Sequence, residues 1–173
     1  MKAKIGSIIL FLVIFQLFFI FPAISTDVPR SFFVNTADGQ PQSIIVVGKN
    51  AASMDSISGG LIITKIQAEA YYEDPSRGMF RVNIWDREKL ITYDELLMEN
   101  VAKNNNLILV GGPVANRLVA NLVQNGKSRI DWYNSQGDIE YIPNGLYLGR
   151  DVVIVAGADR EKTRDAVLRL INS

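Results

Sequence analysis

The chain has 173 residues, 18 basic and 18 acidic side chains, and neither cysteine nor histidine. The two absent residue types exclude Cys–His and Ser–His–Asp nucleophile systems, zinc sites with ordinary ligands and any disulfide framework. The balanced charge leaves no strong positive field that would attract nucleic acid, so no nucleic-acid partner is expected. Beyond the N-terminal segment, the length is that of one domain with a core of its own.

Residues 1–25 have the three-part layout of a secretory signal peptide. Lys2 and Lys4 supply positive charge, an apolar run follows, and Pro22 precedes small residues suited to cleavage. The apolar stretch of residues 5–21 is also close to the roughly 17-residue minimum for a membrane span, so an uncleaved signal anchor is the alternative. In both cases we expect the rest of the chain outside the cytoplasm. Contact with the membrane is expected only if the segment stays uncleaved.

The next two segments differ sharply in composition. Residues 26–43 mix Pro, Asn, Thr and Gly with two phenylalanines, and we predict a linker or an edge segment there. The run 44–47 is apolar and β-branched, which is typical of a strand buried on both faces. A helix is predicted over 53–70. A polar loop over 73–78 then leads to a strand with alternating apolar positions over 80–84.

The middle of the chain repeats this alternation of strand and helix. Thr92 to Glu95 has the form of a capping box, which predicts a short helix from there to about Lys103. Residues 107–110 form a second apolar run. A helix is predicted over 114–124, and Asn125-Gly126 is its stop signal.

The last third of the chain combines turn signals with one more unit of strand and helix. Residues 129–148 look like a β-meander outside the main sheet, with Pro143-Asn144-Gly145 as a hairpin turn flanked by two tyrosines. Residues 152–155 form the third apolar strand. The final helix has an apolar stripe with helical spacing, made of Thr163, Ala166, Val167, Leu170 and Ile171.

Three buried strands that alternate with helices predict an α/β fold. Each strand is apolar on both faces and needs helices above and below, so we expect a three-layer domain with a mainly parallel sheet, plus the small β-meander as an excursion. Right-handed crossovers bring the carboxyl ends of all three strands to one edge of the sheet. Open α/β sheets bind their ligands at that edge.

Three segments make the chain similar to a known family: GKNAASMDSISGGLIITKI, NLILVGGPVANRLVANLV and VVIVAGADREKTRDAVLRLI. In order and spacing they resemble the archaeal S-layer protein family, with LILVGGPVAN as the most specific part. The resemblance covers 44–173, except for the meander, and extends distantly to bacterial cell-wall-binding repeat modules. It implies a structural role at the cell surface or wall. Family subunits are much longer than this chain, so an accessory or anchoring protein is the alternative to a lattice former.

Nine residues near the strand ends form a candidate surface for a ligand or partner: Gly48, Lys49, Asn50, Asp55, Gly111, Gly112, Asn116, Gly157 and Asp159. The glycines can expose backbone N–H groups to an anion, or they can simply permit tight turns. The polar side chains can hold a sugar or a cation, or they can cap helices. None of the turns has a dinucleotide or P-loop fingerprint. We predict no catalytic residue, cofactor or metal site.

The leading hypothesis is therefore an exported, non-enzymatic protein of the cell envelope. Its expected partners are other cell-surface proteins or an envelope polymer, with self-association as a further option. The alternative is an extracytoplasmic domain that binds a sugar or another small ligand, or a hydrolase, acting at the carboxyl edge of the sheet. A third hypothesis is an adhesion or pilus-like subunit, because the meander carries aromatic residues suited to sugar stacking or subunit contact.

Overall fold

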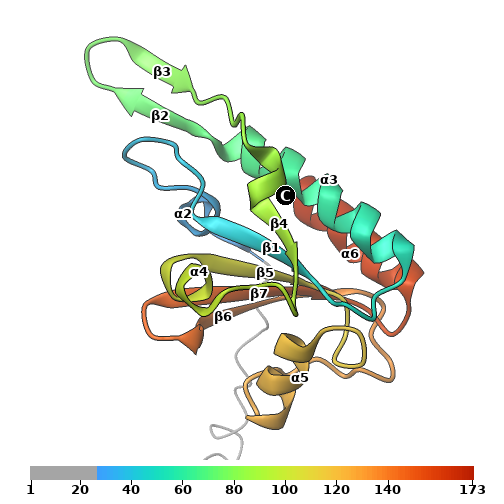
Figure 1. Cartoon of the computed structure of the whole chain (residues 1–173). Helices are drawn as coiled ribbons and strands as arrows, with labels where there is room; N and C mark the ends of the chain where they lie inside the picture. Colours follow the sequence, from blue (N-terminus) through green and yellow to red (C-terminus); the bar gives the residue numbers. More distant parts are fainter. Residues whose placement is uncertain (1–26) are drawn as a thin grey trace, which may run out of the picture.

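The computed structural model describes residues 27–173, so the predicted signal segment lies outside the described residues. Five strands form the main sheet: β1 (Ser43–Val47), β4 (Ile91–Tyr93), β5 (Asn106–Val110), β6 (Asp138–Tyr147) and β7 (Arg150–Ala156). Their order across the sheet is β4-β1-β5-β7-β6 (Figure 1). Within residues 27–173, no helix is both long enough and apolar enough to cross a bilayer.

The predicted parallel strands are confirmed as neighbours. Ile45 of β1 pairs with Ile108 of β5, which in turn pairs with Val153 of β7, and all three strands run in parallel. Every residue of β1 and β5 is buried. This double burial explains why the runs are continuously apolar and lack the alternation of a half-exposed strand.

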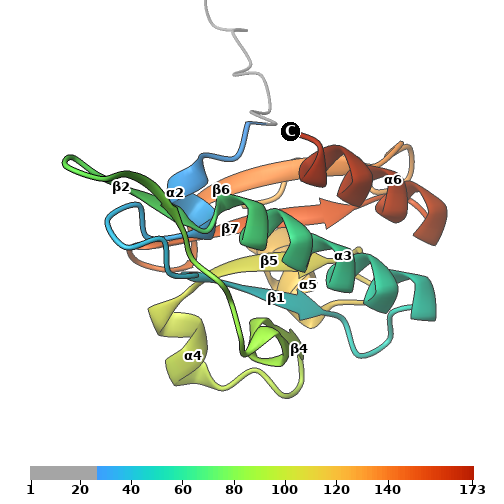
Figure 2. The same ribbon diagram turned by 90° about the horizontal axis from the view of Figure 1, so that it is seen from above.

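Helices cover both faces of the sheet, as predicted: α3 (Ser53–Glu69), α5 (Arg117–Gln124) and α6 (Arg160–Ile171). Helices α3 and α6 lie side by side on one face and α5 lies on the other (Figures 1 and 2). The apolar stripe of α6 is buried as expected, apart from Ile171, which is partly exposed. The three-layer α/β architecture follows directly from these two helix layers.

Residues 27–42 pack against the domain through the short helix α2 (Arg30–Phe33). Phe32 and Phe33 are 1% and 0% exposed, and Phe32 makes an edge-to-face contact with Tyr141 of β6. The guanidinium group of Arg30 lies 3.6 Å from the centre of the Tyr71 ring. The segment therefore adds large apolar side chains to the core.

A separate hairpin, made of β2 (Tyr71–Asp74) and β3 (Gly78–Arg81), projects from the body beyond the end of α3 (Figure 1). The Tyr72 and Phe80 rings stack across it with centroids 5.5 Å apart. The polar loop predicted over 73–78 is shorter than expected, since its first two residues belong to β2. Polar Tyr71–Asp74 gave no strand signal, because both faces of a projecting ribbon are accessible to water.

The capping-box prediction at Thr92 is wrong. Residues Ile91–Tyr93 form the parallel edge strand β4 beside β1, and the next helix, α4 (Glu99–Asn104), begins later and has no side-chain cap. A 3-10 turn (Arg87–Leu90) precedes β4. The backbone pairing of this strand with β1 outweighs the local capping signal. The Asp94 carboxylate is bonded instead to Lys49, in the loop after β1, and to Arg117, at the start of α5.

The excursion predicted over 129–148 is shorter than expected. Residues 138–147 form β6, which pairs antiparallel with β7 at the edge of the main sheet, so only the residues before Asp138 stay outside. The predicted hairpin turn at Pro143–Gly145 is wrong. That segment is an irregularity within β6, where Asn144 has a φ of 52°, and the true turn follows Tyr147. Helix α5 also starts at Arg117, three residues later than predicted.

Candidate functional site

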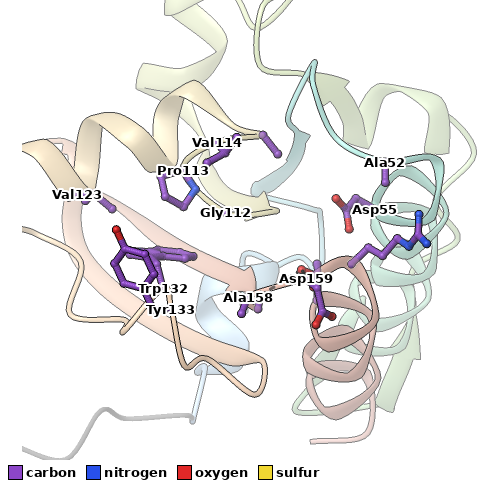
Figure 3. Close-up of a pocket in the computed structure, with 14 residues that line it drawn as sticks. Ala52, Asp55, Gly112, Pro113, Val114, Val123, Trp132, Tyr133, Ala158 and Asp159 are labelled. Atoms are coloured by element: carbon purple, nitrogen blue, oxygen red, sulfur yellow. Dashed lines mark hydrogen bonds between the residues drawn. The ribbon is translucent and has the colours of Figure 1, made fainter.

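A pocket of about 550 Å³ opens at the carboxyl ends of β5 and β7, at the edge of the sheet where a ligand site was expected. Its walls come from the turns after these strands, the start of α3, the end of α5 and the loop before β6 (Figure 3). Of the nine candidate residues, the pocket brings together four: Asp55, Gly112, Gly157 and Asp159.

Asp55 is the chemically unusual member of the pocket. Its side chain is 5% exposed, and its Oδ1 has no hydrogen-bond partner among residues 27–173. Burial raises the pKa of this carboxyl above its ordinary value. The side chain extends from the first turn of α3 into the space opposite Gly112 (Figure 3). Asp55 is therefore a buried acid with one oxygen, Oδ1, that no described protein group satisfies.

Aromatic and apolar side chains form the opposite wall. Trp132 packs over the backbone of Gly112, where an added Cβ would lie 3.4 Å from the indole ring. Tyr133 is 94% exposed at the rim, and Pro113 and Val114 lie beside it in the turn after β5 (Figure 3). The pocket thus combines an apolar wall with a carboxylate on the facing side, which is the usual make-up of a small-molecule site.

The polar groups in the turn after β7 form hydrogen bonds that stabilise the fold. Asp159 is the N-cap of α6, and its Oδ1 accepts a hydrogen bond of 2.9 Å from the Lys162 N–H. The Gly157 N–H donates to Thr163 Oγ1 at 3.0 Å. A Cβ at Gly157 would lie 2.4 Å from the Cβ of Lys162, so close packing requires glycine here. Helix capping is therefore the role of Asp159 that the contacts support.

Asn116 lies away from the pocket and is fully buried. Its amide nitrogen donates to the carbonyls of Val46 (3.0 Å) and Val110 (3.3 Å), while its Oδ1 accepts from the Leu118 and Val119 N–H groups. The side chain thus ties β1, β5 and α5 together. Its bonds are all directed at backbone groups, so it has no free face for a ligand.

Of the remaining candidates, Lys49 contacts Asp94, which the sequence analysis did not single out, whereas Gly111 lies near Asp55, whose Oδ2 would be 3.7 Å from an added Cβ. Asp94 is 2% exposed, and its two carboxylate oxygens accept the Lys49 and Arg117 N–H groups, each at 2.8 Å. The Lys49 ammonium pairs with Glu95, while the Asn50 N–H bonds the Ala115 carbonyl. An aspartate directly after an apolar strand at this edge was the available signal, and it was read as part of a capping box.

Replacing Asp55 with asparagine should raise the free energy of unfolding at neutral pH by about 1–2 kcal/mol, because the desolvated charge is removed. The folded-state pKa lies above the ordinary value of 3.8, so ionisation disfavours the folded state. The free energy of unfolding of the natural protein therefore decreases as the pH rises from below 3.8 through the folded-state pKa, whereas that of the asparagine variant does not. Urea unfolding at several pH values should show the two proteins converging in acid. A constant difference at all pH values would contradict the assignment.

A protein-family model described as "S-layer like family, outer domain" matches residues 87–173, which is 87 of the 173 residues. The chain belongs to the S-layer like family. This confirms the resemblance found in the three glycine-bounded segments, two of which lie inside the matched region. Membership of this family identifies the chain as a structural, non-enzymatic protein of the archaeal cell envelope, located outside the cytoplasm.

Relatives in three methanogenic archaea carry the name S-layer protein. The chain is 53% identical over 70 residues to the protein of Methanocaldococcus jannaschii, and this region is 40% of the chain and 12% of the relative. The identity is 47% over 68 residues with the protein of Methanothermococcus thermolithotrophicus, a region that covers 39% of the chain and 12% of the relative. It is 43% over 70 residues with the protein of Methanococcus voltae, which covers 40% of the chain and 12% of the relative. The aligned region thus spans about an eighth of these S-layer proteins.

Proposed function

We propose that this domain is a packing module of an archaeal surface layer and contacts neighbouring surface-layer subunits through the edge of the sheet at β4. The match of residues 87–173 to the outer domain of the S-layer like family carries the proposal. Assembly with other surface-layer units is the role that the family implies. The structure supports one particular surface for this assembly contact, because an unusual group of apolar side chains is exposed there.

These side chains lie before and after β4. Trp85, Leu96 and Met98 are 83%, 65% and 64% exposed. Two shallow grooves lie at this edge, one lined by Trp85 and Leu90 and the other by Leu96 and Met98, and Lys89 lines both. Tryptophan and methionine are enriched at protein interfaces, and apolar groups that share one surface mark an interaction site.

The edge strand adds a second argument. Strand β4 pairs with β1 on one side and has no strand partner on its other side among the described residues. A free edge presents unpaired backbone groups that another chain can pair with, and natural proteins usually protect such edges with charge or a covering element. Here large apolar side chains flank the edge, which favours contact with a second surface-layer subunit.

An assembly experiment tests this proposal. Purified protein is mixed with solubilised surface layer of its source organism, the layer is allowed to reassemble, and incorporation is measured by sedimentation and electron microscopy. The combined change of Trp85→Ser and Leu96→Ser should reduce incorporation by about tenfold, since exposed aromatic anchors carry much of the binding energy at an interface.

Leu148→Ser is the matched control. Leu148 is 94% exposed in the turn between β6 and β7, at the opposite edge of the sheet from β4, so its replacement should leave incorporation unchanged. Circular dichroism verifies that all variants are folded. Full incorporation of the double variant would contradict the β4 edge as the contact surface, and fractionation of the native protein into the cytoplasm alone would contradict the packing role.

A further inference from the structure

A buried carboxylate without a partner is costly, and the pocket at the ends of β5 and β7 holds one. Asp55 Oδ1 is shielded from water, yet none of the described residues donates a hydrogen bond to it. Ser58, one turn further along α3, also has a buried unpaired hydroxyl, but it does not line the pocket. Such groups are rare in folded proteins and call for an explanation. Asp55 also lines a cavity, which is where a ligand would meet its carboxyl group.

The composition of the pocket narrows the kind of ligand. Asp55 and Asp159 line it against the single cation Arg160, so the local charge disfavours an anion. No group of three acidic side chains among residues 27–173 is placed to hold a metal ion. A purely apolar ligand would leave the Asp55 carboxylate unpaired. What remains is a ligand that carries hydrogen-bond donors together with apolar surface.

We infer that this pocket binds a saccharide unit of the cell envelope. A sugar offers hydroxyl donors to Asp55 and a face of C–H groups to the ring of Trp132, whose face is partly negative. A volume of about 550 Å³ is in the range of small-molecule sites. This inference concerns a different surface from the β4 edge and does not depend on the packing role.

The start of α3 distinguishes a sugar from an organic cation. The N-cap residue Ala52 lines the pocket and provides no side-chain cap, so the Ser53 and Met54 N–H groups have no acceptor within the helix, while the Asp55 N–H is bonded to the Ala52 carbonyl. A sugar hydroxyl both donates and accepts, and it matches both kinds of group. An ammonium or guanidinium ion only donates, and it would leave the N–H groups of the helix without an acceptor.

Fluorescence of Trp132 provides a direct test, since the chain has only two tryptophans. In the Trp85→Phe protein, Trp132 is the single reporter. The full chain is titrated with the methyl glycosides of glucose, mannose, galactose and N-acetylglucosamine, and with spermidine as a cationic probe. We expect a saturable change with at least one glycoside. Asp55→Ala should weaken that affinity by about tenfold or more.

Asp165→Ala is the matched control, because Asp165 is an exposed carboxylate on α6 outside the pocket. It should bind the glycoside as tightly as the parent protein, and thermal unfolding confirms that both variants are folded. A flat response to every glycoside, a response to spermidine alone, or unchanged affinity in Asp55→Ala would each overturn the inference. None of these results would affect the assembly experiment at β4.

The same chemistry can come from two sources in the envelope, and further titrations separate them. One uses glycopeptides released by protease from the purified surface layer, and the other uses polysaccharide extracted from whole envelopes. Binding of the glycopeptides places the sugar on a neighbouring protein, whereas binding of the polysaccharide places it on a polymer. A site that binds neither preparation would also refute an envelope saccharide as the ligand.

Discussion

Replacing Asn116 with alanine should lower the free energy of unfolding by about 3 kcal/mol, a large loss for one side chain. The change removes two hydrogen bonds to the buried carbonyls of Val46 and Val110 as well as the cap on the first turn of α5. Alanine cannot replace either kind of bond, and the buried site excludes bulk water. Chemical denaturation followed by circular dichroism measures the effect.

Asp159→Ala is the comparison that separates the effect of burial on stability from the effect of helix capping. Asp159 also caps a helix, but its side chain is half exposed, so water can replace the lost bond. We expect a loss of about 1 kcal/mol, which is typical of an N-cap. Equal losses at the two positions would contradict the role of Asn116 as a bridge between β1, β5 and α5.

Gly48→Ala should be at least as damaging, with a loss of about 4 kcal/mol or failure to fold. A Cβ at this position would lie 2.1 Å from the Ala115 carbonyl oxygen and 2.7 Å from the Asn116 nitrogen. Both are backbone atoms, so no side-chain rotation can relieve the clash. The turns after β1 and β5 would have to separate, which would also strain the bonds that Asn116 makes.

Gly60→Ala is the matched control for the effect of an added methyl group. Gly60 lies within α3, and a Cβ there would meet no other atom within 4 Å. Alanine favours helix over glycine, so this variant should be more stable than the parent by about 0.5–1 kcal/mol. A small effect of Gly48→Ala, comparable in size to that of Gly60→Ala, would show that the two turns can move apart.

The sequence predicted the parallel centre of the sheet well because those strands are buried on both faces. The runs at 44–47, 107–110 and 152–155 are short, rich in β-branched residues and apolar without interruption, which is typical of a strand between two helix layers. The same criterion missed β4 and β6, which lie at the edges and carry polar residues. Edge strands are specified by their backbone pairing with a neighbour, and no local pattern reveals that neighbour.

The pocket lies at the edge of the sheet where a ligand site was expected, and only four of the nine candidate residues line it. The carboxyl edge of the sheet does hold the pocket, and Asp55 and Gly112 line it. Asn116 is instead bonded to backbone groups of β1, β5 and α5, and short-range sequence patterns cannot show these contacts. Trp132 lies in the segment predicted as a meander, and its position over Gly112 depends on how the loop before β6 folds back, which the sequence does not reveal.

Strand β1 lies between β4 and β5, although it precedes both in the chain and lies outside residues 87–173, the region that matches the outer-domain model. During synthesis it emerges long before either neighbour, and it remains an unpaired apolar segment until both arrive. The region that matches the family model is therefore smaller than the unit that folds. A polypeptide containing only residues 87–173 would have a gap in the middle of its sheet, and it should regain structure only when a peptide carrying residues 27–86 is added.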